Sequence, residues 1–266
     1  MPFTLSHPSI VLPFARLLNR WRVLSATVIG AMVPDFGMFL PWRMERYETH
    51  SRVALFTFCL PVGLIAYWTF QYLIKTPVLE VLPNGAYSRS RARAATADIT
   101  SVRQWVSSVS AIFVGAVSHL VWDAFTHENA RGVRMFPWID EPIAEFGSHR
   151  IMGVRFLQDV SSLIGLAVVV GFVCYALRPE PSHPKPQRAL SARERHAWGL
   201  AYAATAVILA AIGFFWARIG DPYRHFLGMI INGAAIAAVR GLGASLLIVS
   251  AALLLHLRTS SLKRAG

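Results

Sequence analysis

The chain has 266 residues, of which 55% are hydrophobic and only 15% are charged. Soluble domains carry about 25% charged residues, so this composition excludes an ordinary cytosolic enzyme, a disordered chain and a small disulfide scaffold, and it favours an integral membrane protein. The net charge of +12 falls mainly in short connections between apolar runs. Basic residues there are typical of topology signals and lipid-headgroup contacts. We therefore expect the lipid bilayer as a partner and do not expect nucleic acid.

The first 52 residues precede the first clear apolar span. Residues 8–18 predict a short helix, and a second helix is expected from about Leu24 to Met32. Pro34 then removes a helix hydrogen bond, and Asp35 is costly near the middle of a membrane. We expect a partly buried loop at this point, with a further span over Val23–Trp42 as the alternative.

Five later runs are each about long enough to cross the hydrocarbon core, which takes ~20 helical residues. The run ending at Leu257 is apolar back to Phe226 but contains Arg240, so we expect an interfacial segment or a half-helix before Gly241. The predicted fold is an all-α, polytopic membrane helical bundle with about five transmembrane helices, six being possible. The predicted spans are Val53–Ile74, Trp105–Phe125, Val160–Leu177, Trp198–Ile219 and Gly241–Leu257.

The composition also suggests how the chain is divided. The connection from Arg178 to Arg195 is rich in proline and charge, which is typical of a flexible linker. We expect a membrane helical unit with the candidate metal site over residues 1–177, a Pro-rich charged linker over residues 178–197, and a C-terminal transmembrane hairpin over residues 198–266.

Basic residues also predict orientation. The connections 75–103 and 178–195 each carry five Lys or Arg, so the positive-inside rule places them in the cytoplasm. The loop 126–159 and the segment before Val53 would then lie outside. We expect a bacterial inner (plasma) membrane protein with its site on the extracytoplasmic side. The segment before Val53 conflicts with this orientation because it carries six arginines: Arg16, Arg20, Arg22, Arg43, Arg46 and Arg52.

Three residues of metal-ligand type follow one another at the end of the second predicted span. His119, Asp123 and His127 are spaced four residues apart, which places them on one face of a helix, one turn from each other. Ionisable groups inside a span are costly and usually functional. The pattern favours a metal site, and the alternative is a buried His–Asp pair that satisfies its own hydrogen bonds.

His7, Asp35 and His50 all precede the first span. With single crossings at the first two spans, they lie on the same side of the membrane as His127. Each alone also fits a structural role, as a polar terminus, a turn former or an interfacial residue. Together with the helix residues they are imidazole and carboxylate ligands, which suit zinc, manganese or iron better than calcium. Five or more ligands exceed one tetrahedral zinc, so we expect about two divalent ions, bridged by a carboxylate.

Four short stretches resemble a known family. The opening MPFTLSHP, the later PDF, THS and SHLVWDAFTH are similar to an uncharacterised bacterial family of integral membrane proteins, a domain of unknown function. That family resembles the YdjM-like membrane-bound metal-dependent hydrolases and, more distantly, the zinc-dependent phospholipase C and nuclease superfamily. The resemblance covers about residues 1–177, implies a phospholipase C/nuclease-like N-terminal half, and does not extend to the C-terminal hairpin.

The resemblance implies a role for each motif residue. Asp123 matches the aspartate that bridges two metals, and Asp35 and Asp123 would be catalytic. The ligands of a third metal have no clear match, so two ions are implied. The implied metal ligands are His7, Asp35, His50, His119, Asp123 and His127.

The function expected from these observations is a membrane-embedded metal-dependent hydrolase of a phosphoester, with a phospholipid-type substrate and metal-activated water. One alternative is a non-catalytic membrane protein, such as a transport component, a lipid-binding protein or an assembly factor, with a structural metal or polar cluster. Another is a channel or proton path, which would need polar groups in the later spans. The arginines that could hold phosphate oxygens, or simply face solvent and headgroups, are Arg43, Arg46, Arg52, Arg131 and Arg134.

Overall fold

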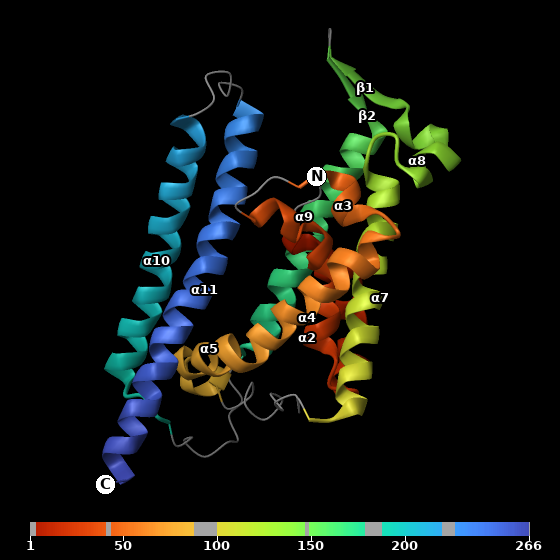
Figure 1. Ribbon diagram of the computed structural model, residues 1–266. Coiled ribbons are helices and arrows are strands. Elements are labelled where there is room, and N and C mark those ends of the chain that lie inside the picture. The colour runs from red at the N-terminus through yellow and green to blue at the C-terminus, as the bar shows by residue number, and fades with distance from the viewer. Residues whose placement is uncertain are drawn as a thin grey trace. The chain divides into compact units, whose positions relative to one another are not determined.

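The computed structural model describes residues 4–40, 44–87, 100–146, 149–178, 188–219 and 227–265. These residues are mostly helical (Figure 1). The predicted bundle of about five transmembrane helices is confirmed, because five described helices are long and apolar enough to cross a membrane. They run over Leu55–Val81, Val102–Thr126, Gly153–Ala176, Ala192–Trp216 and Gly233–Ser261.

The N-terminal segment folds into short helices. They are η1 (Thr4–Ile10), η2 (Leu12–Phe14), α1 (Ala15–Arg20), α2 (Leu24–Met32) and η3 (Val33–Phe39). The helix α2 has the bounds that the sequence predicts. A 3-10 helix follows it in place of the expected loop, and Pro34 is its second residue, where the missing N–H costs no helix hydrogen bond. The apolar stretch Leu24–Phe39 is shorter than the five candidate spans.

The first candidate span joins four helical pieces. A π-helical turn, η4 (Leu55–Cys59), leads into α4 (Leu60–Thr69), and a second one, η5 (Phe70–Ile74), leads into α5 (Lys75–Val81). A proline follows closely after each π-helical turn, namely Pro61 and Pro77. Proline cannot donate a backbone hydrogen bond, and wider turns of this kind are a common way for a helix to absorb the disruption.

The next spans are α7 (Val102–Thr126) and α9 (Gly153–Ala176). The loop between them contains α8 (Arg131–Met135) and η6 (Pro137–Asp140). It also contains an antiparallel pair of strands, β1 (Pro142–Phe146) and β2 (His149–Met152). We expected an all-α fold, and within the described ranges this pair of strands is the one exception to it.

The helices α2 and α7 pack against each other at backbone distance and run in the same direction. The backbone of α7 at Gly115 lies against Thr27 and Ala31, and Gly30 lies against Ile112. A methyl group at Gly115 or Gly30 would collide with the facing backbone, so the approach depends on both glycines. The contact holds the end of α2 against the turn of α7 that follows Gly115.

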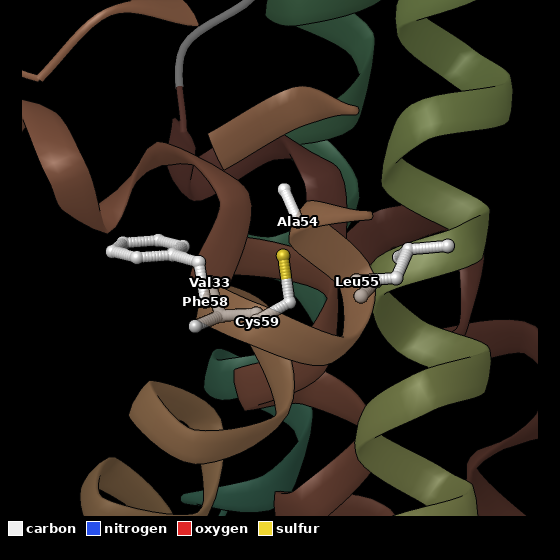
Figure 2. Close-up of a cluster of buried hydrophobic side chains, with 6 residues drawn as sticks. Val33, Ala54, Leu55, Phe58 and Cys59 are labelled. Carbon is white, nitrogen blue, oxygen red and sulfur yellow. The ribbon is translucent and has the colours of Figure 1, made fainter. Parts of the chain in front are cut away.

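A buried apolar cluster joins η3, the first span and α7 (Figure 2). Phe36 and Leu120 pack on its edge. This apolar packing, independently of any polar contact, holds the turn that carries Asp35 next to α7. Its members are Val33, Ala54, Leu55, Phe58, Cys59 and Ala116.

The chain forms two compact units, Met1–Tyr67 with Ala95–Ala176 and Trp68–Ala94 with Leu177–Gly266. The division predicted at residues 177 and 197 stays a prediction. In the second unit, α10 (Ala192–Ile219) packs against α11 (Leu227–Ala265), and Ser245 Oγ donates a hydrogen bond to the carbonyl of Tyr202.

The segment before Gly241, which we expected to be interfacial or a half-helix, is continuous with the span, because α11 is one helix through Arg240. A single arginine does not interrupt the backbone hydrogen bonds of a helix, and its long side chain can extend away from the apolar surface.

Candidate metal centre

The residues that the sequence singled out meet at the C-terminal end of α7. His119 and Asp123 lie on its last two turns, and His127 follows directly after it. His7 comes from η1, Asp35 from η3, and His50 from the short helix α3 (Arg46–His50). All six belong to the first compact unit. Residues from four separate stretches of sequence therefore converge on one place.

Two groups of these side chains could each hold a metal ion. The first is His7, His119 and Asp123, and the second is Asp35, His50 and His119. Within each group the possible ligand atoms all lie within 4.8 Å of one another. Nearly all of these side chains are buried, and His50 is 6% exposed. The centre is thus formed by two overlapping triads.

Asp123 lies between the two groups. Its Oδ1 is 3.8 Å from His7 Nε2 and 3.5 Å from His127 Nδ1. Its Oδ2 is 3.5 Å from both His50 Nε2 and His119 Nε2. The two oxygens of one carboxylate thus face different sets of imidazoles, which is the arrangement that a bridging ligand requires.

Asp123 Oδ2 also approaches two ligands of the second group. Asp35 Oδ1 lies 3.3 Å from His50 Nε2 and 3.6 Å from His119 Nε2, and Asp123 Oδ2 lies 3.5 Å from the same two nitrogens. Ligand atoms bound to a tetrahedral zinc at ~2.1 Å are about 3.4 Å apart. We refer to the triad Asp35, His50 and His119 as the inner position, with Asp123 Oδ2 beside it.

Neighbouring groups orient two of the imidazoles. His119 Nδ1 lies 2.8 Å from the carbonyl oxygen of Ala31. A carbonyl only accepts hydrogen bonds, so Nδ1 carries the proton and Nε2 presents its lone pair to the centre. His50 Nδ1 lies 2.7 Å from Thr49 Oγ1, which leaves His50 Nε2 facing the two aspartates. Sequence reasoning did not identify Ala31, because a backbone carbonyl has no signature in sequence.

His7 stacks on His119, with the two ring centroids 3.7 Å apart. Burial, together with the neighbouring His119, lowers the pKa of His7 to about 4, although Asp123 and Asp35 oppose this shift. Its imidazole is therefore neutral at neutral pH, which is the form that binds a metal ion.

His127 lies at the edge of the centre, with its side chain 15% exposed. Burial lowers its pKa below the usual value against the opposing effect of Asp123, and Arg46 contributes to the lowering. We refer to the buried pair His7 and Asp123 Oδ1, with the partly exposed His127 at its edge, as the outer position.

Many polar atoms of the centre are buried without a hydrogen-bond partner. Native proteins rarely leave buried polar atoms unpaired, because each costs about 1–3 kcal/mol. Lone pairs that converge without donors fit a bound cation. The unpaired atoms in the described part of the centre are both ring nitrogens of His7, Asp35 Oδ2, His50 Nε2, His119 Nε2 and Asp123 Oδ1.

Among the arginines that the structure describes, Arg46 reaches the centre. Its Nη2 donates to Asp123 Oδ2 at 2.8 Å, and its Nη1 lies 3.4 Å from His127 Nε2. The side chain is 45% exposed, so it joins the buried carboxylate to the surface. Its spacing of four residues from His50 on α3 is the sequence signal that could have distinguished it from the other arginines.

The other arginines that we considered are placed less closely or not described. Arg52, Arg131 and Arg134 are exposed. Arg43 lies outside the described residues.

The helix α3 itself is held by a capping box, in which the side chains of Glu45 and Glu48 each accept a hydrogen bond from the other's backbone N–H.

Comparison with known proteins identifies a family but no characterised relative. The family model described as a domain of unknown function (DUF4184) matches residues 1–251. The match extends through most of the C-terminal hairpin, which the resemblance noted from the sequence did not include. No curated protein and no solved structure matches the chain.

Proposed function

We propose that this chain, which belongs to the DUF4184 family of unknown function, is a membrane-embedded metal-dependent hydrolase of a lipid-type phosphoester. The proposal rests on the geometry of the candidate metal centre. The observation that carries the proposal is the position of Asp123, whose two oxygens face separate sets of imidazoles. Two bridged divalent ions are a common solution for phosphoester cleavage. Zinc suits the mixed imidazole and carboxylate ligands, and manganese or iron would also fit.

The two positions suit different roles. With Asp123 Oδ2 as the bridging ligand, the triad of the inner position would gain a fourth protein ligand, and four ligands fill a tetrahedral ion and are typical of a structural metal. The outer position would have at most three, His7, Asp123 Oδ1 and the neighbouring His127, and would therefore leave room for water or substrate, as catalytic zinc sites do. We assign the reaction to the outer position.

The side chains around the outer position have roles in this proposal. A divalent ion bound there would lower the pKa of water to about 7 and polarise a phosphoryl oxygen. Asp123 would hold both ions. Asp35 Oδ2 has no hydrogen-bond partner and could accept a proton. Arg46, half exposed beside Asp123, could bind phosphate oxygens in a bidentate manner.

The centre lies at the end of α7, where a span meets the headgroup region, which suits a phospholipid substrate. The described contacts also bear on the orientation. Arg20 and Arg22 line a cleft together with Arg103, at the opposite end of α7 from Asp123. Their positive charges therefore count on the same side of the membrane as the basic connection 75–103, and not on the side of the metal centre. The positive-inside rule then favours an extracytoplasmic centre with less conflict than the sequence suggested.

Cysteine labelling tests this orientation. In a Cys174→Ser background, a membrane-impermeant maleimide should label Glu128→Cys in intact cells, because Glu128 is exposed beside the centre. Asn19→Cys, on exposed α1 near the arginine cleft, should react only after the membrane is permeabilised. The reverse pattern would place the centre in the cytoplasm.

Activity tests the hydrolase itself. We expect detergent-purified wild type to contain about two transition-metal ions per chain and to hydrolyse a phospholipid phosphodiester in mixed micelles. His127→Ala should reduce turnover by at least about 100-fold, since loss of a single catalytic group typically has an effect of this order, and should retain the inner ion. Asp159→Asn changes an exposed aspartate of α9 and should leave both readouts unchanged.

The closed inner position favours one competing function, a non-catalytic protein with a structural metal. Protein that holds metal only at the inner position, and cleaves none of a panel of phosphomonoesters and phosphodiesters, would support that alternative. Protein that holds no metal would contradict both.

A further inference from the structure

A second candidate site lies at the opposite end of α7. It is a cleft of about 760 Å³ between the α1–α2 turn and the first turns of α7. Twenty residues separate Arg103 in the cleft from Asp123 in the metal centre, or about 30 Å along the helix, which equals the thickness of a hydrocarbon core. The cleft therefore lies at the other membrane boundary and is independent of the proposed hydrolase.

The cleft is strongly basic. Arg20, Arg22 and Arg103 line it, and none of the described lining residues is a carboxylate. Among the described residues, none of these arginines forms an ion pair with an acidic side chain within 4 Å. Both α2 and α7 begin here with no acidic residue in the first turn, so the positive ends of two helices add to the charge. The cleft should attract an anion.

The same cleft also has apolar walls. Leu18, Val23, Val106 and Val114 line it beside the arginines. Val106 and Val114 are 61% and 57% exposed on the membrane-spanning part of α7, and Trp21 is 61% exposed at the rim. Tryptophan is enriched at the membrane–water boundary. A basic head and an apolar wall that continues into the span suit an amphipathic ligand better than a free ion.

The backbone at Arg22 supports a binding role. Arg22 has a φ of 59°, in the left-handed region that non-glycine residues rarely adopt. The turn between α1 and α2 would be easier to form with glycine at this position. An arginine in a strained turn that also lines a cleft fits a functional role for its side chain.

We propose that this cleft binds an anionic phospholipid of the leaflet opposite the metal centre. The headgroup phosphate would contact Arg20, Arg22 and Arg103, and an acyl chain would follow Val106 and Val114. Lipid is favoured over free phosphate because the apolar wall lies at hydrocarbon depth.

Native mass spectrometry of the full chain in detergent tests the proposal. Phosphatidylglycerol should remain bound, whereas phosphatidylcholine with the same acyl chains should be lost at lower collision energy. Sodium phosphate and glycerophosphate at millimolar concentration should not displace the phosphatidylglycerol. Equal retention of the two lipids, or displacement by the soluble phosphates, would overturn the proposal.

A triple variant, Arg20→Gln, Arg22→Gly and Arg103→Gln, should lose the lipid selectively. Each arginine near an anionic lipid strengthens binding roughly fivefold, so the expected loss of affinity is on the order of 100-fold. The charge-matched control is Arg16→Gln, Arg131→Gln and Arg134→Gln, which changes three exposed arginines outside the cleft and should bind as wild type does. Equal binding by the two variants would contradict the proposal.

Two further measurements separate binding from folding. Arg22→Gly alone removes an unfavourable φ, so its Tm without lipid should equal or exceed that of wild type while its affinity falls. If the triple variant does not fold, wild type can be photo-crosslinked to phosphatidylglycerol with a diazirine in one acyl chain. Crosslinks should map to residues 18–27 and 101–114, and crosslinks spread evenly over all spans would overturn the proposal.

Discussion

Asp123→Asn is expected to remove both metal ions from the purified protein. The substitution keeps the size of the side chain but removes the charge that both positions share, since Oδ1 faces His7 and His127 and Oδ2 faces His50 and His119. Loss of a residue that only orients a metal ligand costs roughly 10–100-fold in affinity. We expect a loss of at least about 100-fold here, measured by elemental analysis after dialysis against a weak chelator.

Stability should report the same change. Metal that binds only the folded chain stabilises it, so a strong chelator should lower the Tm of wild type and leave that of Asp123→Asn unchanged. Asp159→Asn makes the same chemical change at an exposed position and should keep the wild-type metal content and chelator response. If Asp123→Asn retained both ions, Asp123 would not be the bridging ligand.

The helical bundle was predictable because its signals are local. Each span is a continuous apolar run, and the bounds of α2 follow from its composition and from Pro34. The spacing of His119, Asp123 and His127 predicted that they share one helix face. The sidedness argument then placed His7, Asp35 and His50 at the same end, and the structure brings their side chains together.

What the sequence could not supply depends on contacts between distant segments. The parallel packing of α2 on α7 places Arg20 and Arg22 beside Arg103. From the sequence alone, all arginines before Val53 were assigned to the same side of the membrane. The role of Arg46 depends on where α3 lies over Asp123. The continuity of α11 through Arg240 shows that one charge is a weak helix breaker when the backbone hydrogen bonds are intact.

Gly115→Ala is expected to destabilise the fold and to damage the metal centre from a distance. A methyl group at residue 115 would collide with the backbone of Thr27 and Ala31, and a backbone cannot rotate away as a side chain can. Overpacking of this kind costs typically 1–3 kcal/mol. The helices must separate, which breaks the hydrogen bond between His119 Nδ1 and the carbonyl of Ala31. We expect a lower Tm and a lower content of inner-position metal.

Gly171→Ala is the matched control, because a methyl group at Gly171 in α9 meets no atom within 4 Å. Alanine is favoured over glycine in a helix interior by about 1 kcal/mol, so this variant should have an unchanged or higher Tm and full metal content. The two substitutions are chemically identical and both lie in a membrane span. Opposite signs in Tm would therefore attribute the effect to the α2–α7 contact. Equal shifts would mean that this contact does not position His119, and that His119 is oriented by its other neighbours.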